Sequence, residues 1–201
     1  METQAVRVHR LVAICALLAT SACSSLGTAE LALQGSQGCV TEARSVTSAP
    51  GRAWLQEQGW RFQSPDEAAS AYTNLVQGAS PWPDWLPPQD TVLPPGTRFQ
   101  MAIGGAQTPD RPGSFGTFDN IDDVEDVRSG LAVRTDWKPE VDRVVTYEVI
   151  EALPVRVGPV GPQVDGQSCR LLMGRWSQLQ LLMPAERRMM YLKVISIRTI
   201  G

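Results

Sequence analysis

The sequence predicts an α+β domain built on a twisted, mainly antiparallel sheet with a few short helices. Many short segments are rich in β-branched and aromatic residues and are bounded by Gly and Pro, whereas helical patterns are few and lie mostly toward the N-terminus. A chain of 201 residues is long enough to bury one core. We expect strands at 97–102, 131–133, 144–150, 155–157, 177–183 and 191–200.

The N-terminal residues have the three parts of an export signal. Arg7 and Arg10 precede the apolar run 11–19, and small residues then lead to Cys23. A small residue directly before a Cys resembles the lipidation signal of bacterial lipoproteins, so we expect a signal peptide at 1–22 and a lipid on Cys23. The signal has a Thr where it prefers Leu, which leaves cleavage as an ordinary secreted protein as the alternative. The apolar run is far shorter than the ~20 residues that a membrane-spanning helix needs.

The segment that follows the signal is small, polar and unperiodic, and it predicts a flexible tether at 23–50 before a folded domain at 51–201. We expect the protein to be exported to the bacterial envelope and anchored at a membrane through the lipid, or to be secreted. Because exported chains favour disulfides, Cys39 and Cys169 are expected to pair; two free buried thiols are the alternative.

Charge and histidine content exclude several classes of function. The formal net charge of -3 gives no electrostatic reason to expect nucleic acid as a partner. The single His, His9, lies in the leader, so a histidine base or metal ligand in the mature chain is excluded. The acidic residues of 122–126 lack the spacing and central Gly of a calcium loop, and a solvated helix start explains them better. We expect no metal site.

Two helices are predicted from their capping residues. Ser64 is a good N-cap, Pro65 fits the first helical position, and Glu67 completes a capping box for a helix that ends at Gly78. Asp119 or Asn120 caps a shorter helix, with Gly130 just past its end and with Ile121, Val124 and Val127 facing inward. Between the two helices, the Pro-rich run 81–88 is expected to pack its tryptophans across the domain surface; a Pro-rich ligand for another protein is the alternative.

The stretch 147–182 is the most informative part of the chain. It holds two apolar, β-branched runs separated by a Pro/Gly corner, and the second run carries Gln178 and Gln180. Successive side chains of a strand point to opposite faces, so these two amides share one face. That face is where we expect a site.

Several motifs occur in an order that resembles the NAD glycohydrolase toxins related to tuberculosis necrotizing toxin. The resemblance covers 93–193 and is strongest over 147–162. The motifs that carry it are Leu93-Pro94-Pro95-Gly96-Thr97-Arg98, Gly113-Ser114-Phe115 or Gly116-Thr117-Phe118, Arg134-Thr135-Asp136-Trp137-Lys138-Pro139, Tyr147 to Pro162, and Gly174-Arg175-Trp176-Ser177-Gln178-Leu179.

The resemblance implies an ADP-ribosyltransferase-like fold and hydrolysis of the nicotinamide–ribose bond, with NAD or NADP as substrate and no separate cofactor. Arg98 would pair with the pyrophosphate, Phe115 or Phe118 would stack on nicotinamide, and Gln178 would orient the ribose and the attacking water. ADP-ribosyl transfer is a related outcome. A toxin of this kind would also have a cognate inhibitor protein as partner. The further candidates are Glu148 as a catalytic carboxylate and Arg134 and Gln180 as substrate-binding residues.

Two departures from the family pattern leave an alternative open. Gly174-Arg175-Trp176 replaces a glycine triplet and puts bulk where the ribose would lie, and the loop after Arg98 is longer. Arg98 could instead bridge to the acidic helix, the phenylalanines could be core, and the two glutamines could face solvent. The alternative function is a non-catalytic envelope lipoprotein that uses the same cleft for a ligand or a protein.

Overall fold

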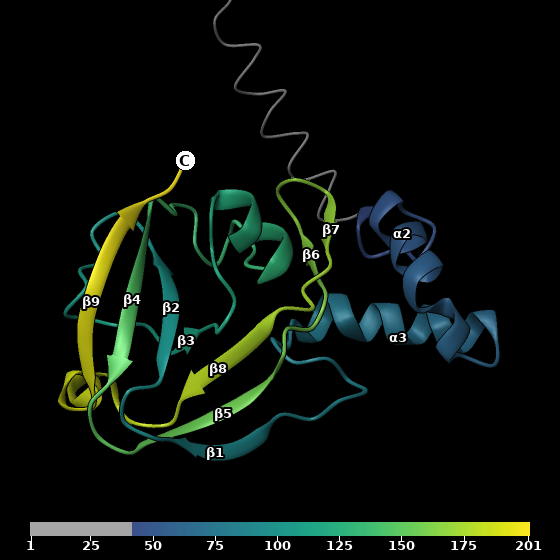
Figure 1. Cartoon of the computed structure of the whole chain (residues 1–201). Helices are drawn as coiled ribbons and strands as arrows, with labels where there is room; N and C mark the ends of the chain where they lie inside the picture. Colours follow the sequence, from purple (N-terminus) through teal and green to yellow (C-terminus); the bar gives the residue numbers. More distant parts are fainter. Residues whose placement is uncertain (1–41) are drawn as a thin grey trace, which may run out of the picture.

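The computed structural model describes residues 42–201, which form an α+β fold with antiparallel sheets and a few short helices (Figure 1). This confirms the predicted fold class. The predicted signal peptide, Cys23 and Cys39 lie outside the described residues. Within 42–201, no helix is both long and apolar enough to span a membrane.

Two antiparallel sheets carry most of the strands. One has the strand order β1-β5-β8-β3 and the other the order β2-β4-β9. A hairpin of β6 and β7 stands apart from them. The bounds are β1 Gln89–Leu93, β2 Arg98–Ile103, β3 Phe115–Gly116, β4 Arg143–Val149, β5 Leu153–Pro159, β6 Gln163–Asp165, β7 Arg170–Leu172, β8 Ser177–Leu181 and β9 Leu192–Thr199.

The two sheets are joined by one bridge between β2 and the end of β3. Gln100 and Thr117 exchange backbone hydrogen bonds of 2.8 and 2.9 Å. A Cβ on Gly116 would lie 2.9 Å from the Gln100 carbonyl oxygen, so glycine permits this close approach. Residues opposite one another in an antiparallel pair project to the same face. One face of the joined sheets therefore carries Arg98, Gln100, Phe115, Thr117, Gln178 and Gln180.

The opposite face forms the main core. The rings of Phe99 and Tyr147 stack with centroids 5.7 Å apart, and Tyr147 is fully buried. The Tyr147 hydroxyl donates to the Pro109 carbonyl at 2.7 Å, which satisfies the polar end of a buried ring. Strand alternation thus separates an apolar core from the polar face that carries the predicted site residues.

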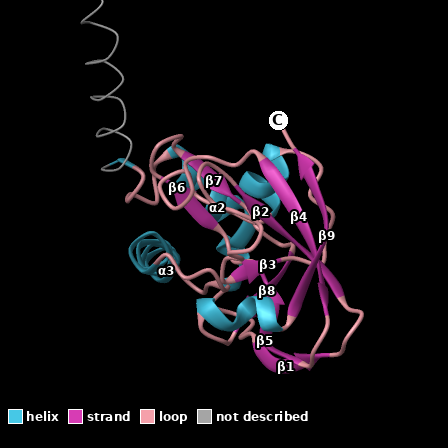
Figure 2. Ribbon diagram, turned by 90° about the vertical axis from the view of Figure 1, so that its left-hand side faces the viewer, coloured by secondary structure: helices cyan, strands magenta, loops and turns pink. Residues whose placement is uncertain are grey.

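Helices α2 and α3 lie together on one side of the molecule, beside the β6–β7 hairpin (Figures 1 and 2). Helix α3, Pro65–Gly78, confirms the predicted helix, and the Ser64 side chain accepts from the Glu67 backbone N–H at 3.2 Å. Helix α2, Ala49–Gln58, was not predicted. The packed part also begins earlier than expected, because Ala43 is 3% exposed and its carbonyl accepts from the Tyr72 hydroxyl at 2.6 Å.

Two short predictions between β3 and β4 differ from the structure. The helix expected from residue 119 or 120 begins only at Val124 and is π-helical over Asp126–Gly130, with the Asp126 N–H donating to Asp123 at 2.9 Å. Ile121, Val124 and Val127 pack into one core cluster, as predicted. The strand expected at 131–133 does not form. Its backbone N–H groups instead donate to Asp126 and Val127 carbonyls, closing the helical turn. Strands β1, β3, β6 and β7 were missed; β1 has four exposed residues of five and no apolar alternation, and β3 is only two residues long.

Candidate functional site

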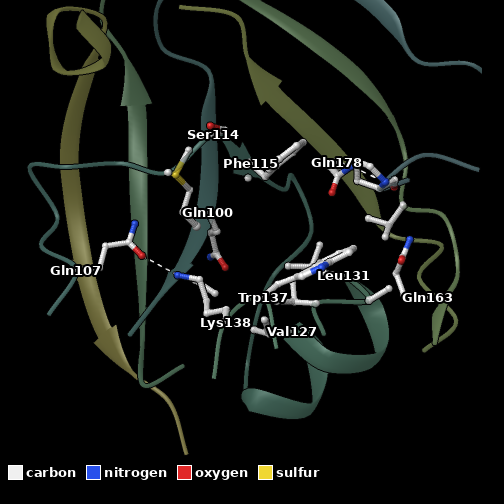
Figure 3. A pocket seen from close by; sticks show the side chains of 18 residues that line it. Gln100, Gln107, Ser114, Phe115, Val127, Leu131, Trp137, Lys138, Gln163 and Gln178 are labelled. Atoms are coloured by element: carbon white, nitrogen blue, oxygen red, sulfur yellow. Dashed lines mark hydrogen bonds between the residues drawn. The ribbon is translucent and has the colours of Figure 1, made fainter. Parts of the chain in front are cut away.

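A cavity of about 340 Å³ lies on the polar face of the joined sheets (Figure 3). Strands β2 and β3 contribute Gln100, Ala102 and Phe115 to its wall. The facing wall comes from the segment 127–138, which lies between β3 and β4 in the chain. It includes Val127, Leu131 and Trp137. Most of the lining is apolar; Gln163 and Gln178 lie at one end, Lys138 and Gln107 at the other, and Gln100 lies between them (Figure 3).

Gln178 reaches the cavity from β8 and is 7% exposed. Its Nε2 donates to the Pro81 carbonyl at 3.3 Å. A carbonyl only accepts, so this contact fixes which end of the amide is nitrogen. Oε1 then faces away from Pro81, and among residues 42–201 no group donates to it. Gln178 Oε1 is therefore a hydrogen-bond acceptor that a ligand in the cavity could use.

The start of β8 is anchored to the bridge between the sheets. The Asp119 carboxylate accepts from the Ser177 backbone N–H at 2.7 Å and from the Ser177 hydroxyl at 2.6 Å. It also accepts from the Thr117 hydroxyl at 3.1 Å. Burial raises the pKa of Asp119, but these hydrogen bonds outweigh it and hold the pKa below its ordinary value. Through these hydrogen bonds, Asp119 fixes the start of the strand that carries Gln178.

Two aromatic rings border the cavity from opposite walls. Phe115 is 42% exposed, and its ring meets that of Trp82 edge-on at 6.4 Å between centroids. Trp137 is on the facing wall, with the Arg134 guanidinium 5.1 Å from its ring centroid. A flat ligand between these walls would have an aromatic face on either side.

Lys138 supplies the charge of the cavity. Its Nζ donates to Gln107 Oε1 at 2.6 Å (Figure 3). Burial lowers the pKa of Lys138, as does repulsion from Arg128, while attraction to Asp142 partly offsets both. No carboxylate is among the described residues that line the cavity. An anion near Lys138 would meet an incompletely hydrated cation.

The structure brings only part of the predicted set to this cavity. Gln178 and Phe115 line it. The other predicted site residues of 42–201 are not among the described residues that line the cavity. Arg98 pairs with Glu148, Arg134 pairs with Asp136 at 2.7 Å, Phe118 is 43% exposed, and Gln180 lies opposite Arg156 on β5. The predicted disulfide stays a prediction, since Cys39 is outside the described residues; Cys169 lies in the β6–β7 turn with φ 53°.

The bulky pair that replaces the family's glycines does not fill the cavity. Arg175 adopts φ 82° and forms an ion pair with Glu57 at 2.6 Å. Trp176 packs on Gly130, where a Cβ would lie 2.6 Å from the indole. Neither Arg175 nor Trp176 is among the described residues that line the cavity, so neither side chain takes up the space where a ribose would bind.

Sequence reasoning missed the other polar residues of the cavity. Gln163 is 1% exposed, and Lys138 and Gln107 form the second polar end. Gln163 directly follows a Gly-Pro pair and precedes Val164, and an amide in such a setting is a signal that could have been followed. Lys138 belongs to one of the motifs that carry the resemblance, which assigns it no role. Among residues 42–201, no group of three His, Cys, Asp or Glu side chains is arranged to hold a metal ion.

Comparisons with known proteins give likeness of fold only. No protein-family model matches the chain, and no curated protein matches it. Similar chains occur in the structures of Tne2 in complex with Tni2 (18% identity, TM-score 0.49, 59% of this chain and 97% of that chain) and of Tse6 in complex with Tsi6 (14%, 0.38, 81% and 97%). Rhs1-CT in complex with its cognate immunity protein RhsI1 is also similar (13%, 0.34, 57% and 82%). The chemistry proposed below therefore depends on this chain's own residues.

Proposed function

We propose that the domain binds NAD⁺ or NADP⁺ in this cavity and hydrolyses the nicotinamide–ribose bond. The observation that carries the proposal is the amide of Gln178, which is held by Pro81 so that its oxygen faces the cavity beside the Phe115 ring. The motif resemblance over 93–193 supports it independently, because it assigns ribose and water positioning to Gln178 and nicotinamide stacking to an aromatic residue of 115–118.

The chemistry asks little of the protein beyond positioning. When the C1′–N bond breaks, its electron pair neutralises the positively charged pyridinium ring, and neutral nicotinamide leaves. Water forms the new bond to C1′ and releases one proton to solvent. Gln178 Oε1 accepts a hydrogen bond from that water and aims its lone pair at C1′. No strong acid is needed, which agrees with a described lining that lacks histidine and carboxylate.

The aromatic walls and the cavity size fit one end of a dinucleotide. Phe115 attracts the flat cationic ring before the bond breaks, through stacking and cation–π attraction. Small-molecule pockets hold roughly 300–1,000 Å³, and the cavity of about 340 Å³ is at the lower end of that range. The cavity thus accepts the nicotinamide riboside portion, and the rest of the dinucleotide extends beyond it.

In this binding mode the cation nearest the cavity is Lys138. The sequence suggests Arg98 for the pyrophosphate, but the Arg98 guanidinium pairs with Glu148 and is outside the lining. Lys138 is partly buried, so its attraction for a phosphate is less screened than that of a surface lysine. We therefore assign the first phosphate contact to Lys138.

The test is nicotinamide release by the purified chain without the predicted leader. The chain is incubated with NAD⁺ or NADP⁺, and free nicotinamide is followed by chromatography. We expect release by the wild type and a loss of about 100-fold or more in Gln178→Ala, in line with removal of a positioning group. Gln180→Ala is the matched control, since Gln180 shares the strand face and lies outside the lining. Absence of release from a folded wild type would overturn the catalytic proposal.

A non-catalytic binding protein is the second candidate. The lining of amides, apolar groups and one lysine, without a carboxylate, favours simple recognition of a flat ligand. Calorimetric titration with NAD⁺ separates the two, because binding without release of nicotinamide supports this candidate alone. If the chain neither binds NAD⁺ nor releases nicotinamide, both candidates are contradicted.

Export and lipidation remain part of the proposal. Replacing Cys23 with Ser should move the protein from the membrane fraction to the soluble fraction if the lipid anchors it. A thiol count on the chain with and without reductant tests the pairing of Cys39 with Cys169. An inhibitor protein bound over the cavity would be expected for a toxin, and co-purification with the product of an adjacent reading frame is the measurement that tests it.

A further inference from the structure

Gln163 is held in the same way as Gln178, although the two residues belong to different sheets. Gln163 Nε2 donates to the Ser80 carbonyl, and Gln178 Nε2 donates to the carbonyl of the next residue, Pro81. Consecutive Cα atoms are only about 3.8 Å apart, so the two amides are held side by side. Figure 3 shows both side chains at the same end of the cavity, away from Lys138 and Gln107.

The two carbonyls also fix the direction of both amides. A carbonyl accepts and does not donate, so each glutamine turns its nitrogen toward the 80–81 segment. Each Oε1 then faces the other way, and within 42–201 no group donates to either oxygen. Both side chains are more than nine-tenths buried. Neither oxygen is itself fully buried, since Arg188 Nε is the one buried side-chain N/O atom without a partner among residues 42–201. Two unpaired acceptors on nearly buried side chains are thus open to the cavity, where the donors of a ligand can reach them.

We propose that Gln163 and Gln178 form a two-acceptor site for a substrate group that carries two adjacent hydrogen-bond donors, with Gln163 as a specificity-determining residue. This rests on the proposed function and extends it to a residue outside the motif resemblance. In the nicotinamide riboside portion of the dinucleotide, which the cavity accepts, two groups have this chemistry: the 2′,3′-diol of the ribose and the NH₂ of the carboxamide.

The same pair determines which way the ligand lies. A phosphate has only acceptor oxygens at its surface when fully ionised, so the two amide oxygens repel it. Lys138 attracts it at the other end of the cavity. The anionic part of the substrate is therefore directed toward Lys138 and the donor-bearing part toward Gln163.

The test measures equilibrium binding, which does not depend on hydrolysis. The wild-type chain and Gln163→Leu are titrated with NAD⁺, with an analogue that lacks the 2′-hydroxyl of the nicotinamide ribose, and with 3-acetylpyridine adenine dinucleotide, which lacks the carboxamide NH₂. We expect Gln163→Leu to bind NAD⁺ about 10-fold more weakly, the loss of one hydrogen bond to a buried acceptor. For the analogue that lacks the true donor, the variant and the wild type should bind alike.

Two outcomes overturn the inference. One is equal binding of NAD⁺ by Gln163→Leu and the wild type. The other is that Gln163→Leu binds both analogues about 10-fold more weakly than the wild type does, as it does NAD⁺. That result would mean that Gln163 contacts neither donor group. Should Gln163→Leu fail to fold, the ligand series on the wild type decides: if both analogues bind as tightly as NAD⁺, the two-acceptor site is refuted. Failure of the proposed function is separate, since it shows as absent nicotinamide release while the binding contrast persists.

Discussion

Arg98 and Glu148 lie opposite each other on β2 and β4, and Arg98 directs both Nε and an Nη toward Glu148 Oε2, at 2.8 and 2.7 Å. The pair is on the same sheet face as the cavity, one side-chain repeat beyond Gln100, and contributes nothing to its described lining. The Arg98 guanidinium is thus engaged by a carboxylate and is not among the described residues that line the cavity. The role that the motif resemblance gives to Arg98 therefore needs a direct test.

Substitution of Arg98 is expected to have small effects. The Arg98 side chain is 61% exposed, and exposed ion pairs contribute about 0–1 kcal/mol. Arg98→Ala should thus lower the free energy of unfolding by less than about 1 kcal/mol and leave nicotinamide release within about threefold of wild type. Urea unfolding and the release assay check both, with Glu148→Gln as the partner variant. A 100-fold loss of release in Arg98→Ala would restore it as the phosphate clamp.

Phe115 and Phe118 form a matched pair of variants. Their side chains are 42% and 43% exposed, so truncation to Ala removes a similarly exposed ring in each case. Of the two, only Phe115 lines the cavity, so only Phe115→Ala should change the binding of NAD⁺. We expect Phe115→Ala to weaken NAD⁺ binding by roughly 10-fold, the scale of one aromatic or cation–π contact. Phe118→Ala should bind as the wild type does. Equal weakening by both variants would argue against stacking on Phe115.

Lys138 should make dinucleotide binding depend on pH. Burial lowers the pKa of Lys138, so its positive charge is lost at a lower pH than that of an ordinary lysine. Affinity for NAD⁺ should therefore fall as pH rises toward 10, while affinity for nicotinamide riboside, which has no phosphate, stays level. Lys138→Met should bind NAD⁺ roughly 10-fold more weakly, the scale of a charge-assisted hydrogen bond. Lys193→Met, at an exposed position of β9, is the control.

Tyr147 should contribute to stability in a pH-dependent way. Burial, helped by the charge of Asp110, raises the pKa of Tyr147 to about 12. A phenol whose folded pKa exceeds the unfolded value of about 10 stabilises the fold fully below pH 10 and loses this contribution as pH rises toward 12, at about 1.4 kcal/mol per unit. Tyr147→Phe should remove roughly 2 kcal/mol of the alkaline decline in unfolding free energy. Tyr191→Phe, at the margin of the same core, should keep the decline.

Asp165 should be needed for the β6–β7 hairpin. It is 2% exposed and accepts from Thr135 Oγ1 at 2.6 Å, the Gln167 N–H at 2.9 Å and Ser168 Oγ at 3.0 Å. Burial raises the pKa of Asp165, but these bonds outweigh it and the pKa lies below its ordinary value.

The stabilisation from Asp165 is consequently present above pH 4 and lost as pH falls through the lowered pKa. Asp165→Asn should cost about 1–3 kcal/mol at pH 7, and less at pH 3, where the wild type itself weakens. Denaturant unfolding at the two pH values measures this. Asp136→Asn, in an exposed ion pair with Arg134, should change the unfolding free energy by less than about 1 kcal/mol.

The elements that the sequence predicted correctly are those determined by neighbouring residues. The cap at Ser64 and the apolar stripe behind it specify α3 locally, and alternation specifies β2 and β4. The strand expected at 131–133 failed because its N–H groups found partners in the preceding turn, and Ala132 takes φ 47°. Strand β1 has no alternation to detect and exists through its pairing with β5.

The sequence by itself determined the fold class and that Gln178 and Gln180 share one face of a strand, because strand alternation is a local property. Phe115 joins that face through the pairing of β3 with β8, which the sequence did not predict. Only the tertiary structure decided that Arg98 pairs with Glu148, that Trp176 packs on Gly130, and that Lys138 faces the cavity. It also decided that the carbonyls of Ser80 and Pro81 orient two distant glutamines. Such contacts join segments far apart in the chain, and their formation depends on how the whole domain packs rather than on any local pattern.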